Sequence, residues 1–200
     1  MKAYCINLKR RTDRLAEVKR ECKKNMLDMV LIEAVDGKEV YSHVEGNIMK
    51  GALGCYDSHL KALKLIKESG ETGLIIEDDA VFIDNFRVEY KKRIDELPDK
   101  WDMFFLGGSM LWENPTEPYS ENLLKAKNIL CTQAYLVNIK SIDKLIKKVE
   151  EKQWKIDVIY TDFQQKNNCF ISYPEIAWQR KGYSDLVDSI TDNKHLRYGK

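Results

Sequence analysis

Short apolar runs alternate along the chain with apolar residues at helical spacing. Three short apolar runs predict strands: residues 3–8, 29–35 and 74–76. The third is continuously apolar, which is typical of a strand covered on both faces. Helical spacing in residues 12–24, and from Leu53 until Gly70, predicts two amphipathic helices. Residues 38–50 follow neither period, so we expect a loop over the end of the sheet.

The second half of the chain continues this alternation. Further strands are expected in three apolar segments: residues 102–106, 129–137 and 170–173. Asn85 is positioned to cap a helix that ends before Pro98, and Ser141 begins another helix with one apolar face. Residues 110–127 are polar and proline-containing, and we expect a long connection that serves as a lid or a substrate-binding loop.

Strands that alternate with helices predict an α/β fold. A chain of 200 residues with 44% hydrophobic residues is expected to form one domain with one packed core. We therefore predict that residues 1–200 fold around a mixed, mostly parallel sheet flanked by helices. Residues 100–137 hold two predicted strands without a clear helix between them, so antiparallel pairs are expected there.

Three consecutive acids, Glu77, Asp78 and Asp79, follow the apolar run at residues 74–76. Carboxylates rarely occur inside a buried element unless they are paired or metal-bound. The pattern therefore predicts an acidic cluster at the carboxyl end of a central strand, where open α/β sheets bind ligands. Because the three charges repel one another, a hard divalent cation with oxygen ligands is the expected partner. The alternative is a strand followed by a solvated acidic turn.

Composition and charge exclude several functional classes. With 33 basic and 32 acidic residues, the net charge of +1 gives no electrostatic case for binding nucleic acid or a membrane surface. The N-terminus has no long apolar segment, so neither a signal peptide nor a transmembrane span is predicted. Five widely spaced cysteines without a C-x-x-C pair indicate buried thiols in a reducing compartment, and a cytoplasmic protein is expected.

A basic turn follows the first predicted strand. Thr12 is a candidate cap for the next helix, and Arg11 and Arg14 are expected near the strand end, where guanidinium groups can grip a diphosphate. Arginines in a first helical turn oppose the helix dipole, so an anionic partner would relieve that conflict. A solvated basic helix start is the alternative.

Ser58 and His59 are neighbours near the start of the second long helix. Adjacent helical residues point about 100° apart, so the pair is poorly placed to act as nucleophile and base, and a serine-hydrolase function is set aside. His59 is expected either to orient a ligand or a carboxylate, or to be a plain core histidine.

Taken together, the motifs resemble those of the family 25 glycosyltransferases. The matching stretches run nearly from end to end: Ile6-Asn7-Leu8 with Arg11, Asp13 and Arg14; Ala34-Val35-Asp36-Gly37; Gly54-Cys55 with Ser58-His59; Ile76-Glu77-Asp78-Asp79-Ala80; Phe105-Leu106-Gly107; Ala134-Tyr135-Leu136; Asp157; Pro174; and Ser184-Asp185. Each match is weak alone, but their order and spacing are specific.

The resemblance implies a GT-A-like, nucleotide-sugar-binding fold and an inverting hexosyltransferase. The implied donor is UDP-galactose or UDP-glucose, and the implied acceptor is a hydroxyl group on a glycan, a lipooligosaccharide or hydroxylysine. The acidic triplet looks like the family's counterpart of the D-x-D motif, which holds Mn²⁺ (or Mg²⁺) against the diphosphate. A bridging cation offsets the charge of the departing nucleotide.

The resemblance and the residues together assign roles to individual side chains. Glu77 and Asp79 are the expected metal ligands, because they are two residues apart on one face of a strand. The donor nucleotide sugar is expected to contact eight residues: Asn7, Leu8, Arg11, Arg14, Asp36, Ser58, His59 and Asp78.

Inversion requires a general base that deprotonates the acceptor hydroxyl. Asp157 is the first candidate and Asp162 the second, and either is alternatively a structural or binding group. The acceptor side is expected to include Gln179, Ser184 and Asp185. In many GT-A enzymes a late histidine completes the metal shell, and His195 in a polar tail is the one candidate for it here.

Two other functions remain open at this stage. A non-catalytic relative that binds a nucleotide sugar or a glycan would share the fold, although decay should erase the acidic cluster first. A phosphotransferase or receiver-like domain also uses acidic strand ends, but the chain has no phosphate loop. The sequence indicates neither the acceptor nor the oligomeric state.

Overall fold

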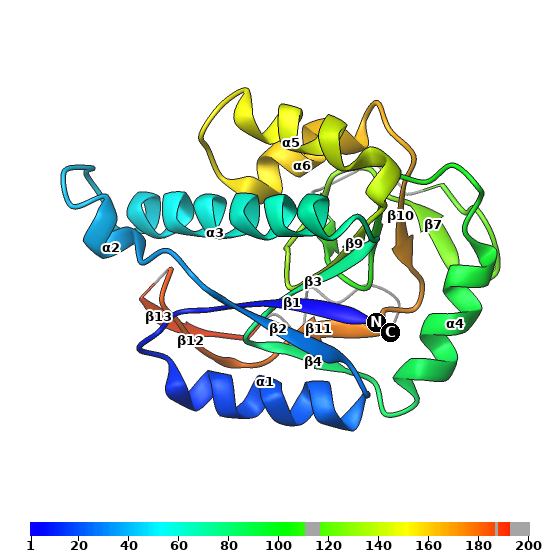
Figure 1. Cartoon of the computed structure of the whole chain (residues 1–200), viewed down its shortest axis with the longest axis horizontal. Coiled ribbons are helices and arrows are strands. Elements are labelled where there is room, and N and C mark those ends of the chain that lie inside the picture. Colours follow the sequence, from blue (N-terminus) through cyan, green and yellow to red (C-terminus); the bar gives the residue numbers. More distant parts are fainter. Residues whose placement is uncertain (111–116, 187, 193–200) are drawn as a thin grey trace.

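A seven-stranded sheet forms the centre of the computed structural model, which describes residues 1–110, 117–186 and 188–192 (Figure 1). Across the sheet the strands are β2 (Asp28–Glu33), β1 (Lys2–Asn7), β3 (Gly73–Glu77), β9 (Ala134–Val137), β5 (Met103–Phe105), β10 (Cys169–Ser172) and β7 (Leu123–Lys125). The expected α/β fold is confirmed, with the acidic strand β3 inside the sheet.

Strand directions agree with a mixed, mostly parallel sheet. β1 pairs in parallel with β2 and β3, and β5 pairs in parallel with β10. β9 runs antiparallel between β3 and β5, and β7 is antiparallel to β10. The antiparallel pairing expected between residues 100 and 137 is therefore confirmed by the β5–β9 pair.

Side-chain alternation along the strands divides the core into two layers. On β1, Tyr4 and Ile6 face one layer, while Ala3 and Cys5 face the other. The first layer packs against α3 (Asn47–Ser69), α5 (Ile142–Glu150) and α6 (Ile156–Gln164). The second packs against α1 (Thr12–Lys24) and α4 (Phe86–Glu96), and Figure 1 shows α3 and α1 on opposite sides of β1. This two-sided cover explains why β3 is continuously apolar.

Short elements complete the described chain. They are α2 (Gly37–Val40), β4 (Ala80–Phe82), β6 (Ser109–Met110), β8 (Ile129–Leu130), the 3₁₀ turn η1 (Ile139–Ser141), β11 (Ala177–Gln179), β12 (Gly182–Ser184) and β13 (Ser189–Thr191). β4 pairs with β11, β6 with β8, and β12 with β13, all antiparallel. The β4–β11 pair brings the C-terminal region against the segment that follows the acidic residues.

Three predicted segments differ from the structure. The expected loop at residues 38–50 contains α2, and α3 already begins at Asn47. The strand expected at 129–137 is two strands, because Cys131 has a φ of 76° and breaks the extended conformation. The connection expected at 110–127 contains β7. This strand is held by main-chain pairing with β10, and its sequence shows little apolar periodicity from which a strand could be predicted. Residues 111–116 of that connection lie outside the described residues.

Neither predicted helix cap makes its backbone hydrogen bond. Thr12 is the first residue of α1, and Arg11 occupies the capping position. Asn85 does precede α4, but its side-chain amide donates to the Glu89 carboxylate instead of accepting from the helix backbone.

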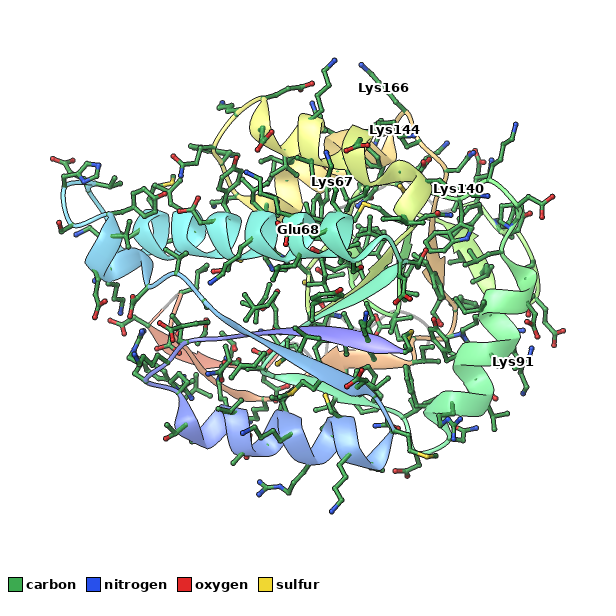
Figure 2. All side chains as sticks on the ribbon, in the orientation of Figure 1. Lys67, Glu68, Lys91, Lys140, Lys144 and Lys166 are labelled. Carbon is green, nitrogen blue, oxygen red and sulfur yellow. The ribbon has the colours of Figure 1, made fainter. Side chains whose placement is uncertain are left out.

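Charged side chains on the outer faces of the helices point into solvent, as Figure 2 shows for Lys91 on α4. These positions alternate with the buried helix faces, as amphipathic spacing predicts. Among the described residues, none of the helices combines the length and apolar character that crossing a bilayer requires.

Close backbone contact fixes α3 against the turn that follows β2. A Cβ atom placed on Gly54 would lie 2.6 Å from the carbonyl oxygen of Val35 and 2.6 Å from the backbone nitrogen of Gly37. Side chains cannot move aside to relieve such a contact, because both neighbours are backbone atoms. Gly54 therefore sets the position of the turn that carries Asp36.

We predict that Gly54→Ala lowers the free energy of unfolding by about 2 kcal/mol, because overpacking against backbone outweighs the better helix propensity of alanine. Urea denaturation at equilibrium measures the change. Gly182→Ala is the control, since a Cβ there meets no atom within 4 Å. Equal stability of the two variants would contradict the proposed contact.

Candidate active site

A cavity of about 450 Å³ lies at the carboxyl ends of β1, β2 and β3. Its lining residues come from seven parts of the chain: 6, 8, 10 and 14; 34–38; 51, 52, 55, 58 and 59; 77–79; 131–133; 155–157; and 179, 184–186 and 191. Because these three parallel strands end at the same edge of the sheet, the turns after them meet there. The cavity therefore lies where the sequence predicted a ligand site.

The acidic triplet lies on one wall of this cavity. Glu77 is the last residue of β3, whereas Asp78 and Asp79 form the turn that leads into β4. The location at the strand end is confirmed, but Glu77 and Asp79 do not share one continuous strand face as expected. The chain turns immediately after Glu77, because β4 pairs with β11 instead of continuing the main sheet.

Hydrogen bonds from the C-terminal region hold Asp79 in place. Gln179 Nε2 donates to Asp79 Oδ2 at 2.9 Å, and the Arg180 backbone nitrogen donates to the Asp79 carbonyl oxygen at 2.8 Å. Asp79 Oδ1 is buried and has no hydrogen-bond partner among the described residues. A carboxylate oxygen of this kind fits a hard divalent cation such as Mn²⁺ or Mg²⁺. Gln179 thus positions the acidic turn, and the acceptor-side role expected for it has no support in this contact.

Arg14 supplies positive charge to the acidic turn. Its Nη1 lies 2.6 Å from Asp78 Oδ1 and 3.3 Å from Asp79 Oδ2, and Nη2 donates to the Tyr183 carbonyl oxygen at 2.8 Å. Burial raises the pKa of Asp78 to about 6 and that of Asp79 to about 7, and the Arg14 charge opposes both shifts. The charge of Arg14 therefore does not fully offset the cost of burying the two carboxylate charges.

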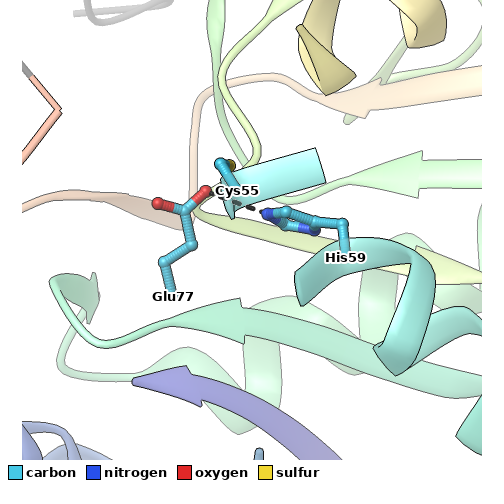
Figure 3. A group of neighbouring side chains, drawn as sticks. All are labelled: Cys55, His59 and Glu77. Carbon is cyan, nitrogen blue, oxygen red and sulfur yellow. Dashed lines mark ion pairs between the residues drawn. The ribbon is translucent and has the colours of Figure 1, made fainter. Parts of the chain in front are cut away.

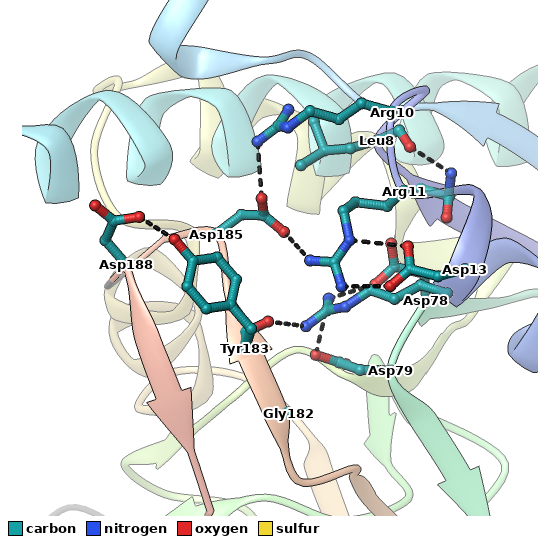
Figure 4. Close-up of polar contacts among 12 residues, drawn as sticks. Leu8, Arg10, Arg11, Asp13, Asp78, Asp79, Gly182, Tyr183, Asp185 and Asp188 are labelled. Atoms are coloured by element: carbon teal, nitrogen blue, oxygen red, sulfur yellow. Dashed lines mark hydrogen bonds and ion pairs between the residues drawn. The ribbon is translucent and has the colours of Figure 1, made fainter.

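A second group of charges joins the N-terminal turn to the C-terminal hairpin. Asp185 accepts hydrogen bonds from Arg10, at 2.9 Å, and from Arg11 (Figure 4). Arg10 also pairs with Asp36. Asp185 therefore lines the cavity next to the basic turn, and the acceptor-side role expected for it stays a prediction. The sequence interpretation missed Arg10, although it belongs to the basic run that was singled out.

Glu77 faces another part of the cavity from Asp78. Its Oε1 accepts a hydrogen bond from Thr132 Oγ1 at 2.6 Å and lies 3.5 Å from His59 Nε2. Figure 3 shows Cys55 beside this pair. His59 Nδ1 is 2.8 Å from the Tyr135 hydroxyl, so His59 is oriented by a tyrosine and faces a carboxylate. Sequence reasoning missed Cys55 as a site residue, although its spacing of four residues from His59 on a helix indicates a shared face.

The two candidate bases differ in position. Asp157, at the start of α6, lines the cavity, and its Oδ1 accepts a hydrogen bond from the Val158 backbone nitrogen at 2.8 Å. Burial raises the pKa of Asp157, and the charge of Glu77 adds to the shift. Asp162 is on a different face of α6, with a side chain that is 70% exposed and 3.9 Å from Lys148. Asp162 is therefore too far outside the cavity to serve as the base.

The remaining predicted donor contacts divide into two groups. Leu8, Asp36 and Ser58 line the cavity, but the Ser58 hydroxyl is used locally, donating to the Gly54 carbonyl and accepting from the Val35 backbone nitrogen. Asn7 and Arg11 do not line it. Asn7 is buried and its amide donates to the Leu8 carbonyl oxygen, so it supports the turn after β1.

Ser184 and His195 are the remaining predicted site residues. Ser184 lines the cavity from the hairpin β12–β13, as expected for a residue near substrate. His195, the candidate late metal ligand, lies outside the described residues.

A sequence profile described as glycosyltransferase family 25 (LPS biosynthesis protein) matches residues 1–160. The chain belongs to glycosyltransferase family 25. Residues 1–160 include the basic turn, the acidic triplet and Asp157, whereas Gln179 and Asp185 lie beyond the matched region.

Curated relatives in this family include procollagen galactosyltransferases. The chain is 26% identical to procollagen galactosyltransferase 2 of Homo sapiens over 167 residues, covering 72% of this chain and 27% of the relative. It is 28% identical to procollagen galactosyltransferase 1 of Danio rerio over 172 residues, covering 72% of this chain and 28% of the relative. The chain thus spans about a quarter of the length of these relatives.

Solved structures support the fold. A glycosyltransferase involved in the glycosylation of the major capsid of PBCV-1 superposes with a TM-score of 0.53 at 10% identity, covering 98% of this chain and 97% of that one. A197 from STIV superposes with a TM-score of 0.52 at 10% identity, covering 100% and 94%. Family 25 membership and a GT-A-like fold therefore agree.

We predict that Arg14→Gln lowers the free energy of unfolding by about 3 kcal/mol at pH 8 without divalent metal, because the buried Asp78 and Asp79 carboxylates lose their cation. Chemical denaturation measures it. Arg20→Gln on the exposed side of the same helix is the control and should change stability by less than about 0.5 kcal/mol. An unchanged Arg14→Gln variant would mean that the charge of Arg14 is not needed there.

Proposed function

We propose that this chain is a metal-dependent, inverting hexosyltransferase. It transfers galactose or glucose from a UDP-sugar to a hydroxyl group on a glycan, a lipooligosaccharide or a hydroxylysine-type acceptor. The family match and the relatives named as galactosyltransferases support this assignment. The single observation that carries it is Asp79 Oδ1, a buried carboxylate oxygen without a partner on the wall of the cavity.

The acidic turn is the part of the site that suits a divalent cation. Asp79, with Asp78 or Glu77 beside it, supplies the oxygen ligands that Mn²⁺ or Mg²⁺ prefers. When bound, such a cation offsets the charge that develops on a departing nucleoside diphosphate. Gln179 and the Arg180 backbone keep the turn in one conformation, so the ligand oxygens need little reorganisation.

The arginines of the N-terminal turn suit the diphosphate of the donor. Arg10 and Arg14 line the cavity, and their guanidinium groups are paired with Asp36, Asp185, Asp78 and Asp79. A diphosphate offers oxygen pairs of the same geometry as these carboxylates. Binding of the donor would therefore replace the carboxylate partners of these guanidinium groups with phosphate oxygens, while the guanidinium groups stay in place.

Asp157 acts as the general base in this proposal. Its carboxylate accepts the proton of the acceptor hydroxyl while the hydroxyl oxygen forms a bond to the anomeric carbon. The bond between that carbon and the diphosphate oxygen breaks on the opposite face, and its electron pair leaves with the nucleotide. A raised pKa makes Asp157 a stronger base than an exposed aspartate.

We predict metal-dependent release of UDP from UDP-galactose or UDP-glucose, and a loss of about a hundredfold or more for Asp79→Ala. A panel of nucleotide sugars assayed for nucleotide release with Mn²⁺, with and without chelator, measures both effects. Chelator should abolish release by the unmodified protein. Release that survives both chelator and Asp79→Ala would exclude the metal assignment. Binding of the nucleotide sugar without any release would favour a non-catalytic binding protein.

We predict that Asp157→Asn lowers kcat for transfer by about a hundredfold or more, with a smaller change in donor KM, because the amide cannot accept the hydroxyl proton. Steady-state kinetics with a saturating acceptor measures the two constants. Asp162→Asn is the matched control on the same helix and should retain full kcat, since its side chain faces solvent. Equal activity of the two variants would remove Asp157 as the base.

A further inference from the structure

Cys55, His59 and Glu77 form a compact group of side chains with three different donor atoms (Figure 3). Their sulfur, nitrogen and oxygen atoms all lie within 4.8 Å of one another. Cys55 and His59 are one helical turn apart on α3, and Glu77 reaches them from the end of β3. All three residues line the cavity, so a small ion can reach the group.

His59 has an unused nitrogen within this group. Its Nε2 is buried and has no hydrogen-bond partner in the part of the chain that the structure describes, because the 3.5 Å to Glu77 Oε1 is too long for a well-formed bond. A buried imidazole nitrogen without a partner is costly. A metal ion bound to Nε2 would remove that cost.

The other polar atoms of the group are already oriented for metal binding. Thr132 donates to Glu77 Oε1 at 2.6 Å, and His59 Nδ1 is 2.8 Å from the Tyr135 hydroxyl. The Tyr135 hydroxyl in turn lies 2.8 Å from that of Tyr160. The Tyr135 hydroxyl can accept a hydrogen bond from the protonated Nδ1 of His59 and donate its own proton to the Tyr160 hydroxyl. In that tautomer the lone pair of His59 Nε2 is free to bind metal. Outer contacts of this kind are usual around metal-binding histidines.

We propose that Cys55, His59 and Glu77 bind a thiophilic divalent cation of the Zn²⁺ class. Thiolate, imidazole and carboxylate are the ligand types that Zn²⁺ takes, with three protein ligands and an open fourth position in sites that face a cavity. Atoms bound to one Zn²⁺ lie about 3.5 Å apart by its bond lengths. His59 Nε2 and Glu77 Oε1 already have that separation of 3.5 Å. The Cys55 sulfur lies within 4.8 Å of the other ligand atoms and needs to approach them by about 1 Å. The Cys55 thiol releases its proton to solvent on binding.

This site differs in chemistry from the oxygen ligands of Asp78 and Asp79. Mn²⁺ and Mg²⁺ prefer oxygen, whereas a sulfur ligand selects softer ions. Glu77 already points towards His59 and Cys55, so a cation bound there keeps this carboxylate where it is and leaves Asp78 and Asp79 for the cation proposed for catalysis.

Co²⁺ binding to chelator-treated protein tests the proposal without any assay of activity. A thiolate bound to Co²⁺ gives a charge-transfer band in the near ultraviolet, whereas Co²⁺ bound to carboxylates alone gives none. We expect this band in the unmodified protein, its displacement by Zn²⁺, and its loss in Cys55→Ser. Cys169→Ser, a buried thiol on β10 that does not line the cavity, should keep the band.

A second measurement removes any dependence on the folding of Cys55→Ser. His59→Gln keeps the thiol and should weaken Co²⁺ binding by about tenfold or more, because one of three ligands is lost. Zn²⁺ should also slow alkylation of Cys55 in the unmodified protein, as measured by peptide mass spectrometry. Cys131, which lines the same cavity, serves as the internal control and should alkylate at an unchanged rate. Absence of the band, its persistence in Cys55→Ser, or equal protection of Cys131 would overturn the proposal.

Discussion

Negative charge at the carboxyl end of β3 is the constraint that organises the site. Three consecutive acids follow a strand that is buried on both sides, so their charges cannot be dispersed into solvent. The chain surrounds them with partners from distant segments: Arg14 from α1, Thr132 before β9 and Gln179 on β11. Each partner occupies some of the carboxylate oxygens, and within the described part of the chain Asp79 Oδ1 is left without a hydrogen bond, which is why we propose a cation there.

Local patterns predicted the elements that have a periodic apolar face. The strands β1, β2 and β3 and the helices α1 and α3 were all anticipated, and the acidic triplet was correctly expected at the edge of the sheet. Such elements are predictable because burial of one face imposes a spacing that the sequence must carry. The same reasoning failed for β7 and the break at Cys131, where backbone pairing and one residue with positive φ determine the structure.

Partners across the site were less predictable than its position. The sequence predicted a divalent cation at the acidic triplet, but nothing local showed that Arg14, 64 residues from Asp78, pairs with that carboxylate. The ion pairs of Asp185 with Arg10 and Arg11, more than 170 residues away, were also not visible in any local pattern. Pairings of this kind follow from the three-dimensional course of the chain, which periodicity does not encode.

The antiparallel pair β4–β11 has a consequence for the order in which the site is assembled. Asp79 and the Gln179 amide that fixes it are separated by 100 residues. During synthesis the acidic turn leaves the ribosome long before β11 exists, so the nascent chain carries its charged residues without their final support. The acidic turn can therefore reach its hydrogen-bonded arrangement only after residues 177–180 have been synthesised and β11 has paired with β4.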